Sequence, residues 1–352
     1  MAGIFGFFDY TKEGPGVDPH EPPKGAVATF FGILGRKFWD IIKINLEYLI
    51  FSLPFLLIAF VGSGYIMQLL WPQIQIDRIV QLMASYNPAQ AGNLDDLRAA
   101  AATLILLFNL ILAGTLFGLT YFNFGPTLGG ITKLLRNYGR EEHAFLWMDF
   151  KESFVRNWKL TLPASIISSL VILLMAIAVT FYGQANMNRY LSILLSAILW
   201  IGFFYFTMMQ MYLYPILITF DLSRKNAYRN AALFVILRLP FNVGIMLLQL
   251  IILAGIPITI YVFLPNVGPL IIMAYYLFFA FGFNYLLTNF FVWRQLERFM
   301  IKPMQDAATE VEAEAVEVSA YDEDPEFDDV YDEDYDEAED ESDVPEPEGA
   351  PA

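Results

Sequence analysis

Basic residues are distributed unevenly between the connections that join six long apolar stretches of this chain. A helix needs about 20 apolar residues to span a bilayer, and the stretches cover approximately residues 41–62, 100–122, 160–182, 191–220, 241–263 and 268–292. Of the 21 Lys and Arg residues, only Arg78, Arg98 and Arg189 lie in the three connections that would share one side of a membrane. Positive charge in short loops stays cytoplasmic. The pattern therefore predicts six spans with the N-terminus and the C-terminus in the cytoplasm.

The composition agrees with a membrane protein. The chain is 57% hydrophobic with a mean hydropathy of +0.48, whereas soluble domains are about 45–50% apolar. The expected fold class is all-α: a polytopic membrane helix bundle of six transmembrane helices, with short cytoplasmic interfacial helices and a disordered acidic C-terminal tail. We expect this multi-pass protein in a plasma membrane, with the lipid bilayer as its surroundings.

The sequence divides into three regions: an N-terminal arm (1–28), a membrane domain (29–304) and a tail (305–352). No cleavable signal peptide is expected, because residues 1–35 hold prolines and scattered acids rather than a basic start and a short apolar core. The tail carries 22 of the 37 Asp and Glu residues and no Lys or Arg. Such a segment buries too little apolar surface to offset chain entropy, so the tail is predicted to be disordered.

Patterns that support catalysis or metal binding are missing from the sequence. The chain has no Cys, and its two His residues, His20 and His143, cannot build a typical zinc site. No phosphate-binding loop and no nucleophile elbow occur. We therefore expect no enzyme activity, no catalytic residues, no metal site and no cofactor, and we expect no nucleic-acid partner.

Polar residues in the predicted spans are few. Lys43 and Glu47 are the only charged ones, and their spacing of one helical turn predicts an interfacial pair that reaches toward water. Uncharged amides in or near spans usually form hydrogen bonds between helices; an amide-lined path for a solute is the alternative use. The six amides are Asn109, Gln210, Asn242, Gln249, Asn284 and Asn289.

The connection of residues 123–159 holds the densest mixture of aromatic and charged side chains. Apolar residues recur there at helical spacing, first at Leu128, Ile131, Leu134, Leu135 and Tyr138, and then at Trp147, Phe150, Phe154 and Trp158. The spacing predicts two short helices that lie in the inner interface with their apolar sides toward lipid. Two readings stay open: a structural elbow, or a surface that a partner binds. The candidate partner surface comprises Arg136, Asn137, Glu142, His143, Trp147 and Asp149.

The same connection resembles a known family signature. The stretch GPTLGGITKLLRNYGREEHAFLWMDFKESFVRNWK, together with GIFGFFDYTKEGPGV and TFDLSRKNAYRNAALFVILRLP, is similar to the YesL-like family of bacterial membrane proteins. The resemblance covers most of residues 1–240, and residues 63–99 and the tail look like additions. It implies a multi-span membrane protein of unknown function, often associated with carbohydrate uptake or degradation in Gram-positive bacteria, and it brings no catalytic residues.

Two functions follow as hypotheses. The first is a non-enzymatic accessory or interaction subunit of a bacterial transport system; the resemblance implies carbohydrate uptake and, as partners, components of an ABC-type sugar importer. The second is a transporter or channel for a small solute in its own right. The sequence gives no indication of the oligomeric state, the solute or the identity of a partner.

Overall fold

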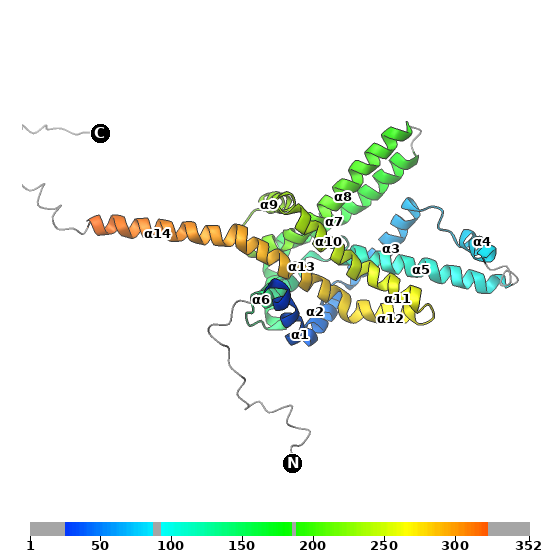
Figure 1. Cartoon of the computed structure of the whole chain (residues 1–352), viewed down its shortest axis with the longest axis horizontal. Coiled ribbons are helices and arrows are strands. Elements are labelled where there is room, and N and C mark those ends of the chain that lie inside the picture. Colours follow the sequence, from blue (N-terminus) through cyan, green and yellow to red (C-terminus); the bar gives the residue numbers. More distant parts are fainter. Residues whose placement is uncertain (1–24, 87–92, 185–187, 323–352) are drawn as a thin grey trace, which may run out of the picture. The chain divides into compact units, whose positions relative to one another are not determined.

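The computed structural model describes residues 25–86, 93–184 and 188–322, and every regular element among them is a helix (Figure 1). Three of the helical segments are single π-helical turns (η3 to η5), which widen the helices that contain them. The order is α1 (Ala26–Arg36), α2 (Phe38–Phe51), α3 (Leu53–Leu70), α4 (Ile76–Tyr86), α5 (Leu94–Gly118), α6 (Gly125–Gly139), α7 (Leu146–Gln184), α8 (Arg189–Thr219), α9 (Arg224–Leu237), α10 (Leu239–Leu250), η3 (Ile251–Gly255), α11 (Ile256–Phe263), α12 (Gly268–Tyr275), η4 (Tyr276–Ala280), α13 (Phe281–Leu296), η5 (Glu297–Ile301) and α14 (Lys302–Asp322).

The described part of the chain has six helical segments that are long and apolar enough to cross a membrane. This confirms the predicted number of spans and the all-α class. The segments are Leu53–Leu70, Leu94–Gly118, Leu146–Gln184, Arg189–Thr219, Leu239–Phe263 and Gly268–Glu312. Residues 1–294 and 295–352 form two units, and the helix bundle described below belongs to the first.

The first of these segments begins later than predicted. Residues 41–62 are divided between α2 and α3, because the helix is interrupted at Ser52 and starts again at Leu53. Pro54 occupies the first turn of α3, where its missing N–H costs nothing and its fixed φ favours a helix start. The expected span over 41–62 with a proline inside is therefore corrected to Leu53–Leu70, with α2 as a separate helix before it.

The third segment is longer than predicted. The expected interfacial helix around Trp147 and the expected span over 160–182 form a single helix, α7, which continues through Pro163. Hydroxyls near the proline donate to carbonyls of their own helix: Thr161 to Asn157 at 3.0 Å and Ser165 to Leu162 at 2.8 Å. Such side-chain bonds help a membrane helix to tolerate proline, so α7 runs from Leu146 to Gln184 without a break.

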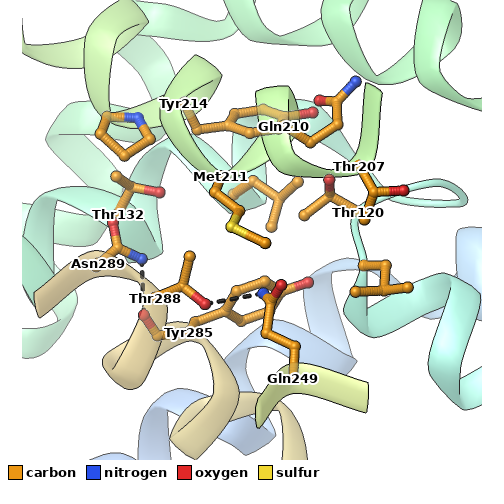
Figure 2. Close-up of a pocket in the computed structure, with 13 residues that line it drawn as sticks. Thr120, Thr132, Thr207, Gln210, Met211, Tyr214, Gln249, Tyr285, Thr288 and Asn289 are labelled. Carbon is orange, nitrogen blue, oxygen red and sulfur yellow. Dashed lines mark hydrogen bonds between the residues drawn. The ribbon is translucent and has the colours of Figure 1, made fainter. Parts of the chain in front are cut away.

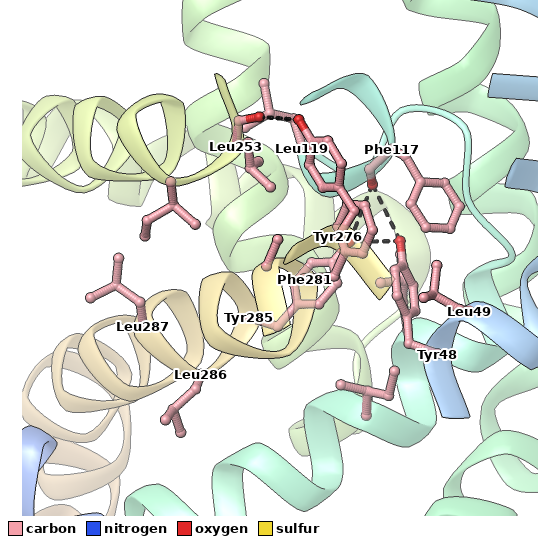
Figure 3. Packing of buried hydrophobic residues seen from close by; sticks show 14 of the residues in the cluster. Tyr48, Leu49, Phe117, Leu119, Leu253, Tyr276, Phe281, Tyr285, Leu286 and Leu287 are labelled. Carbon is pink, nitrogen blue, oxygen red and sulfur yellow. Dashed lines mark hydrogen bonds between the residues drawn. The ribbon is translucent and has the colours of Figure 1, made fainter. Parts of the chain in front are cut away.

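The core is rich in aromatic side chains that join helices far apart in the sequence (Figure 3). The ring of Tyr48 on α2 lies 4.8 Å from that of Phe117 on α5, and its hydroxyl lies 2.8 Å from the Tyr285 hydroxyl on α13. Tyr48 also bonds Asn123, which follows α5. These contacts hold the non-helical residues 119–124, between α5 and α6, inside the bundle.

Five of the six amides predicted to bond between helices do so, whereas Asn289 bonds within its own helix. Asn109 accepts from Ser63 at 2.6 Å, Gln210 donates to Ser168 at 2.7 Å and Gln249 donates to Thr288 at 2.8 Å. Asn242, Asn284 and Asn289 likewise have partners. The predicted pair of Lys43 with Glu47 is wrong, because the Lys43 ammonium lies 3.1 Å from Asp40 instead. Long side chains on a helix lean toward its N-terminus, which directs Lys43 toward Asp40.

The ends of the chain are described only in part. Of the predicted N-terminal arm, residues 1–24 lie outside the described residues, and α1 begins at Ala26. In the long connection 63–99, α4 packs through Val80 on α5. Where a disordered tail was expected from residue 305, α14 is helical to Asp322, and residues 323–352 lie outside the described part of the chain.

Candidate functional site

Helix α6 is enclosed by protein on all sides. Twelve of its 15 residues are buried, among them the small residues Gly125, Gly129 and Gly130. It packs against α7 and α8 and also touches α1 and α2. The prediction that α6 lies in the interface with its apolar side toward lipid is therefore wrong, because small residues on its other side allow α7 to approach as closely as protein packing permits.

Close contact between α6 and α7 begins at Gly125. A Cβ atom at this position would lie 1.9 Å from the Thr161 carbonyl oxygen. One turn further, the Ser153 hydroxyl donates to the Gly129 carbonyl at 2.9 Å. The two helices therefore form a tight pair. We use the name elbow for this pair and for the turn of residues 140–145 that joins the two helices. We call this side of the bundle the elbow end.

The six residues of the predicted partner surface do not form one surface. Asn137 is buried and Arg136 is mostly enclosed, whereas Glu142, His143 and Trp147 are exposed. Asp149 is half-buried and works within the elbow. Its carboxylate accepts from the Phe145 backbone N–H at 2.8 Å and lies 3.6 Å from the Lys133 ammonium. The structure thus brings three of the six to the outside and uses the other three for packing.

Arg136 occupies an unusual setting for a guanidinium. It donates to the Thr219 hydroxyl at 3.2 Å and lies 5.8 Å from the centre of the Trp293 ring. No described carboxylate lies within ion-pair distance, and its Nε has no partner there. Burial lowers the pKa of Arg136, and neighbouring Arg140 acts in the same direction. An arginine stays protonated nevertheless, so a fixed positive charge stands at this point.

Charged groups and aromatic rings share the outside of the elbow. Arg36 on α1 pairs with Glu141, and the Arg140 guanidinium lies 2.8 Å from Glu142. A hollow of about 300 Å³ lies beside the turn and is lined by Ile33, Arg36, Lys37, Tyr138, Glu141, Glu142 and His143. Next along the chain, Phe145, Trp147 and Met148 are all more than half exposed. The elbow therefore presents apolar and ionic groups side by side.

A small polar cavity lies deeper in the bundle, between α8 on one side and α10 and α13 on the other (Figure 2). Its volume is about 30 Å³, room for about two water molecules. Gln210 and Gln249 lie nine and ten residues from the elbow ends of α8 and α10, about 15 Å at the helical rise. The cavity thus lies near mid-depth. Its lining is Leu119, Thr120, Leu128, Thr132, Thr207, Gln210, Met211, Tyr214, Pro215, Gln249, Tyr285, Thr288 and Asn289.

Both glutamines line this cavity, and their amide oxygens have no protein partner. Their orientation follows from the neighbouring hydroxyls. Ser168 donates its proton to the Ala164 carbonyl and Thr288 donates to the Asn284 carbonyl, each at about 2.9 Å or less. Each hydroxyl can then only accept, so each must receive the NH₂ of its glutamine. The Thr120 and Tyr214 hydroxyls also have no protein partner, and buried polar groups usually bond to protein or to ordered water.

The described residues hold no group of three or more His, Asp or Glu side chains that could bind a metal ion. Comparisons with family models, curated proteins and solved structures give no match for this chain. Fold and site therefore define the class by themselves: an α-helical protein with six candidate membrane spans, an enclosed helix at one end and a small cavity at mid-depth that uncharged polar and apolar side chains line.

Proposed function

We propose that this chain is a YesL-like, non-enzymatic protein of the bacterial cytoplasmic membrane that serves a transport system as an accessory or interaction subunit. The partner is a component of an ABC-type sugar importer. The observation that carries this proposal is the elbow, whose three exposed apolar residues lie outside the hydrophobic part of α7 and beside ion pairs. Aromatic anchors bordered by charges are typical of protein interfaces.

The orientation of the protein follows from the charge pattern and is directly testable. The elbow end would face the cytoplasm, with both termini there. Asp77→Cys and Asn266→Cys should then react with a membrane-impermeant thiol reagent in intact cells, whereas Arg140→Cys and Asn226→Cys should not. All four positions are exposed and the chain has no native Cys. Labelling of the second pair before cell lysis would reverse the assignment.

Trp147 is the residue through which partner association is tested. Trp147→Ala should reduce the importer component recovered with the protein in mild detergent by roughly tenfold or more, because an aromatic anchor at an interface contributes about 2 kcal/mol. The matched control is Trp158→Ala. This residue is also partly exposed and lies three turns further along the same helix. Its loss should leave recovery unchanged.

Two outcomes would count against this proposal. Equal losses from Trp147→Ala and Trp158→Ala would indicate a general disturbance of α7 rather than a docking site. If deletion of residues 73–93 abolished association while Trp147→Ala had no effect, the partner would bind the end of the bundle opposite the elbow.

The polar cavity favours a second function, movement of a small solute by the protein itself. Neutral oxygens without partners near mid-depth of a helix bundle are typical of solute sites in membrane proteins. The purified chain in liposomes should then raise solute flux above that of empty liposomes. Flux equal to that of empty liposomes for every solute tried would contradict this second function and leave the accessory role untouched.

A further inference from the structure

A second cavity adjoins the polar one. It has a volume of about 200 Å³, lies among α3, α5, α7, α8 and α10, and is almost wholly apolar. Its lining reaches Leu70 and Trp71 at the end of α3, and it shares Leu119 with the polar cavity. On α8, Phe203 lines the apolar cavity and Thr207, one turn later, lines the polar one. On α10, Leu250 lines the apolar cavity and its neighbour Gln249 lines the polar one. The two cavities therefore lie in series along the bundle.

Leu119 stands between them on non-helical backbone. Residue 120 has a φ of 68°, and the chain does not become helical again until Gly125. The segment is deep in the bundle: the Tyr121 carbonyl accepts from Ser169 at 2.6 Å, and its hydroxyl lies 2.7 Å from Thr207. Thr207 is twelve residues, about 18 Å, from the end of α8. Non-helical backbone at such depth occurs where protein buries it or where it lines a polar cavity.

The elbow side of the polar cavity carries the positive charge of Arg136. Three cavity residues each have a neighbour one turn further on their own helix: Thr132 has Arg136, Pro215 has Thr219, and Asn289 has Trp293. Those three neighbours contact one another through the guanidinium. A fixed arginine beside a narrow path excludes cations. The glutamine oxygens, in turn, accept hydrogen bonds and repel anions.

We propose that the two cavities are successive parts of one path for water or another uncharged hydrogen-bond donor of similar size, with the Leu119 side chain as the barrier between them. The path extends the second function proposed above and depends on it. The polar cavity binds the donor through the Gln210 and Gln249 oxygens, and the apolar cavity leads toward the end of the bundle opposite the elbow. An apolar side chain closes such a path by excluding water from the constriction.

The test uses the full-length chain in phosphatidylethanolamine–phosphatidylglycerol liposomes, with osmotic shrinkage followed by light scattering. Leu119→Ala should raise water permeability roughly tenfold over the wild type, which corresponds to about 1.4 kcal/mol of barrier. Leu116→Ala is the matched control, because Leu116 lines the apolar cavity but not the polar one. Its permeability should equal that of the wild type. Adding Gln249→Leu to Leu119→Ala should remove most of the gain.

Selectivity and folding are measured on the same samples. Rubidium flux should stay at the empty-liposome level in every variant, and the variants should elute as the wild type does in size exclusion. Leu119→Val, a smaller truncation, should give an intermediate rise and replaces the alanine variant if that one does not reconstitute.

Three results would overturn the path. They are equal permeability of Leu119→Ala and Leu116→Ala, a rubidium flux that rises together with water, and no effect of Gln249→Leu in the Leu119→Ala background. If the wild type carries a solute while Leu119→Ala behaves like Leu116→Ala, the second function stands and the path through Leu119 falls.

Discussion

Gly125→Ala should lower the apparent melting temperature by about 5 °C or more, or prevent recovery of folded protein. The added methyl would lie 1.9 Å from the Thr161 carbonyl oxygen and 2.9 Å from the Leu162 backbone nitrogen. Neither group is the end of a flexible side chain, so α6 and α7 must separate. Overpacking costs about 1–3 kcal/mol when side chains can adjust, and a backbone clash belongs at or above the upper end. Each kcal/mol shifts the melting temperature of a chain of 150–250 residues by about 2–4 °C.

Gly139→Ala is the control for this prediction. Gly139 is the last residue of the same helix, and its nearest neighbour for an added Cβ is the Phe290 ring at 3.8 Å, an ordinary contact. Intrinsic tryptophan fluorescence follows the melting of both variants in detergent. A fall of less than about 3 °C for Gly125→Ala, the shift expected for 1 kcal/mol, would mean that α6 is not held against α7 as described.

The number of spans was readable from the sequence because it depends on length and local composition. The second stretch overlaps Leu94–Gly118 but runs four residues past its end, into non-helical backbone; four of the others coincide with candidate spans to within the usual uncertainty of helix ends or lie inside a longer helix. The first did not, because Pro54 was placed within a helix rather than in its first turn. Hydropathy is the same whether a proline lies in the first turn of a helix or in its interior. Only the backbone geometry at the proline distinguishes the two positions.

The burial of α6 on all sides could not be predicted from length and composition in this way. Its apolar residues recur at helical spacing, which predicts one buried face. Its other face carries Gly125, Gly129 and Thr132, which look like a polar side toward solvent in a periodicity argument. In the structure these small residues are the contact with α7 and with the polar cavity. The signal that indicates enclosure is the small size of these side chains, not their polarity.

The sequence predicted the hydrogen bonds of the two cavity glutamines but not the cavity itself. The amides of Gln210 and Gln249 were expected to bond between helices, and their NH₂ groups do. Their partners, Ser168 and Thr288, are 42 and 39 residues away in the chain, and the sequence gives no means of pairing them. The sequence also does not indicate that the two glutamine oxygens have no protein partner. That outcome depends on the hydrogen bonds that Ser168 and Thr288 donate within their own helices.

Asn45→Ala should destabilise the protein by about 3 kcal/mol. The side chain is fully buried on α2 and satisfies three backbone groups at the π-turn η4. Its NH₂ donates to the carbonyls of Tyr276 and Leu277 at 3.0 and 2.6 Å, and its oxygen accepts from the Gly282 N–H at 2.8 Å. A buried backbone group left without a partner costs about 1–3 kcal/mol. No water can easily replace the amide, since a Cβ on Gly282 would already lie 2.7 Å from the Ile41 carbonyl oxygen.

Asn289→Ala gives the matched comparison. Asn289 is the same residue type and is also buried, but it donates only to the Tyr285 carbonyl of its own helix. That carbonyl lies in the interior of α13, where the helix supplies a backbone donor. Its removal should cost less than about 1 kcal/mol, the typical contribution of one such hydrogen bond in a membrane protein. Thermal unfolding of the two variants side by side decides the matter. Equal losses would show that Asn45 contributes no more than an ordinary buried amide, and that α12 and α13 keep their wide turn without it.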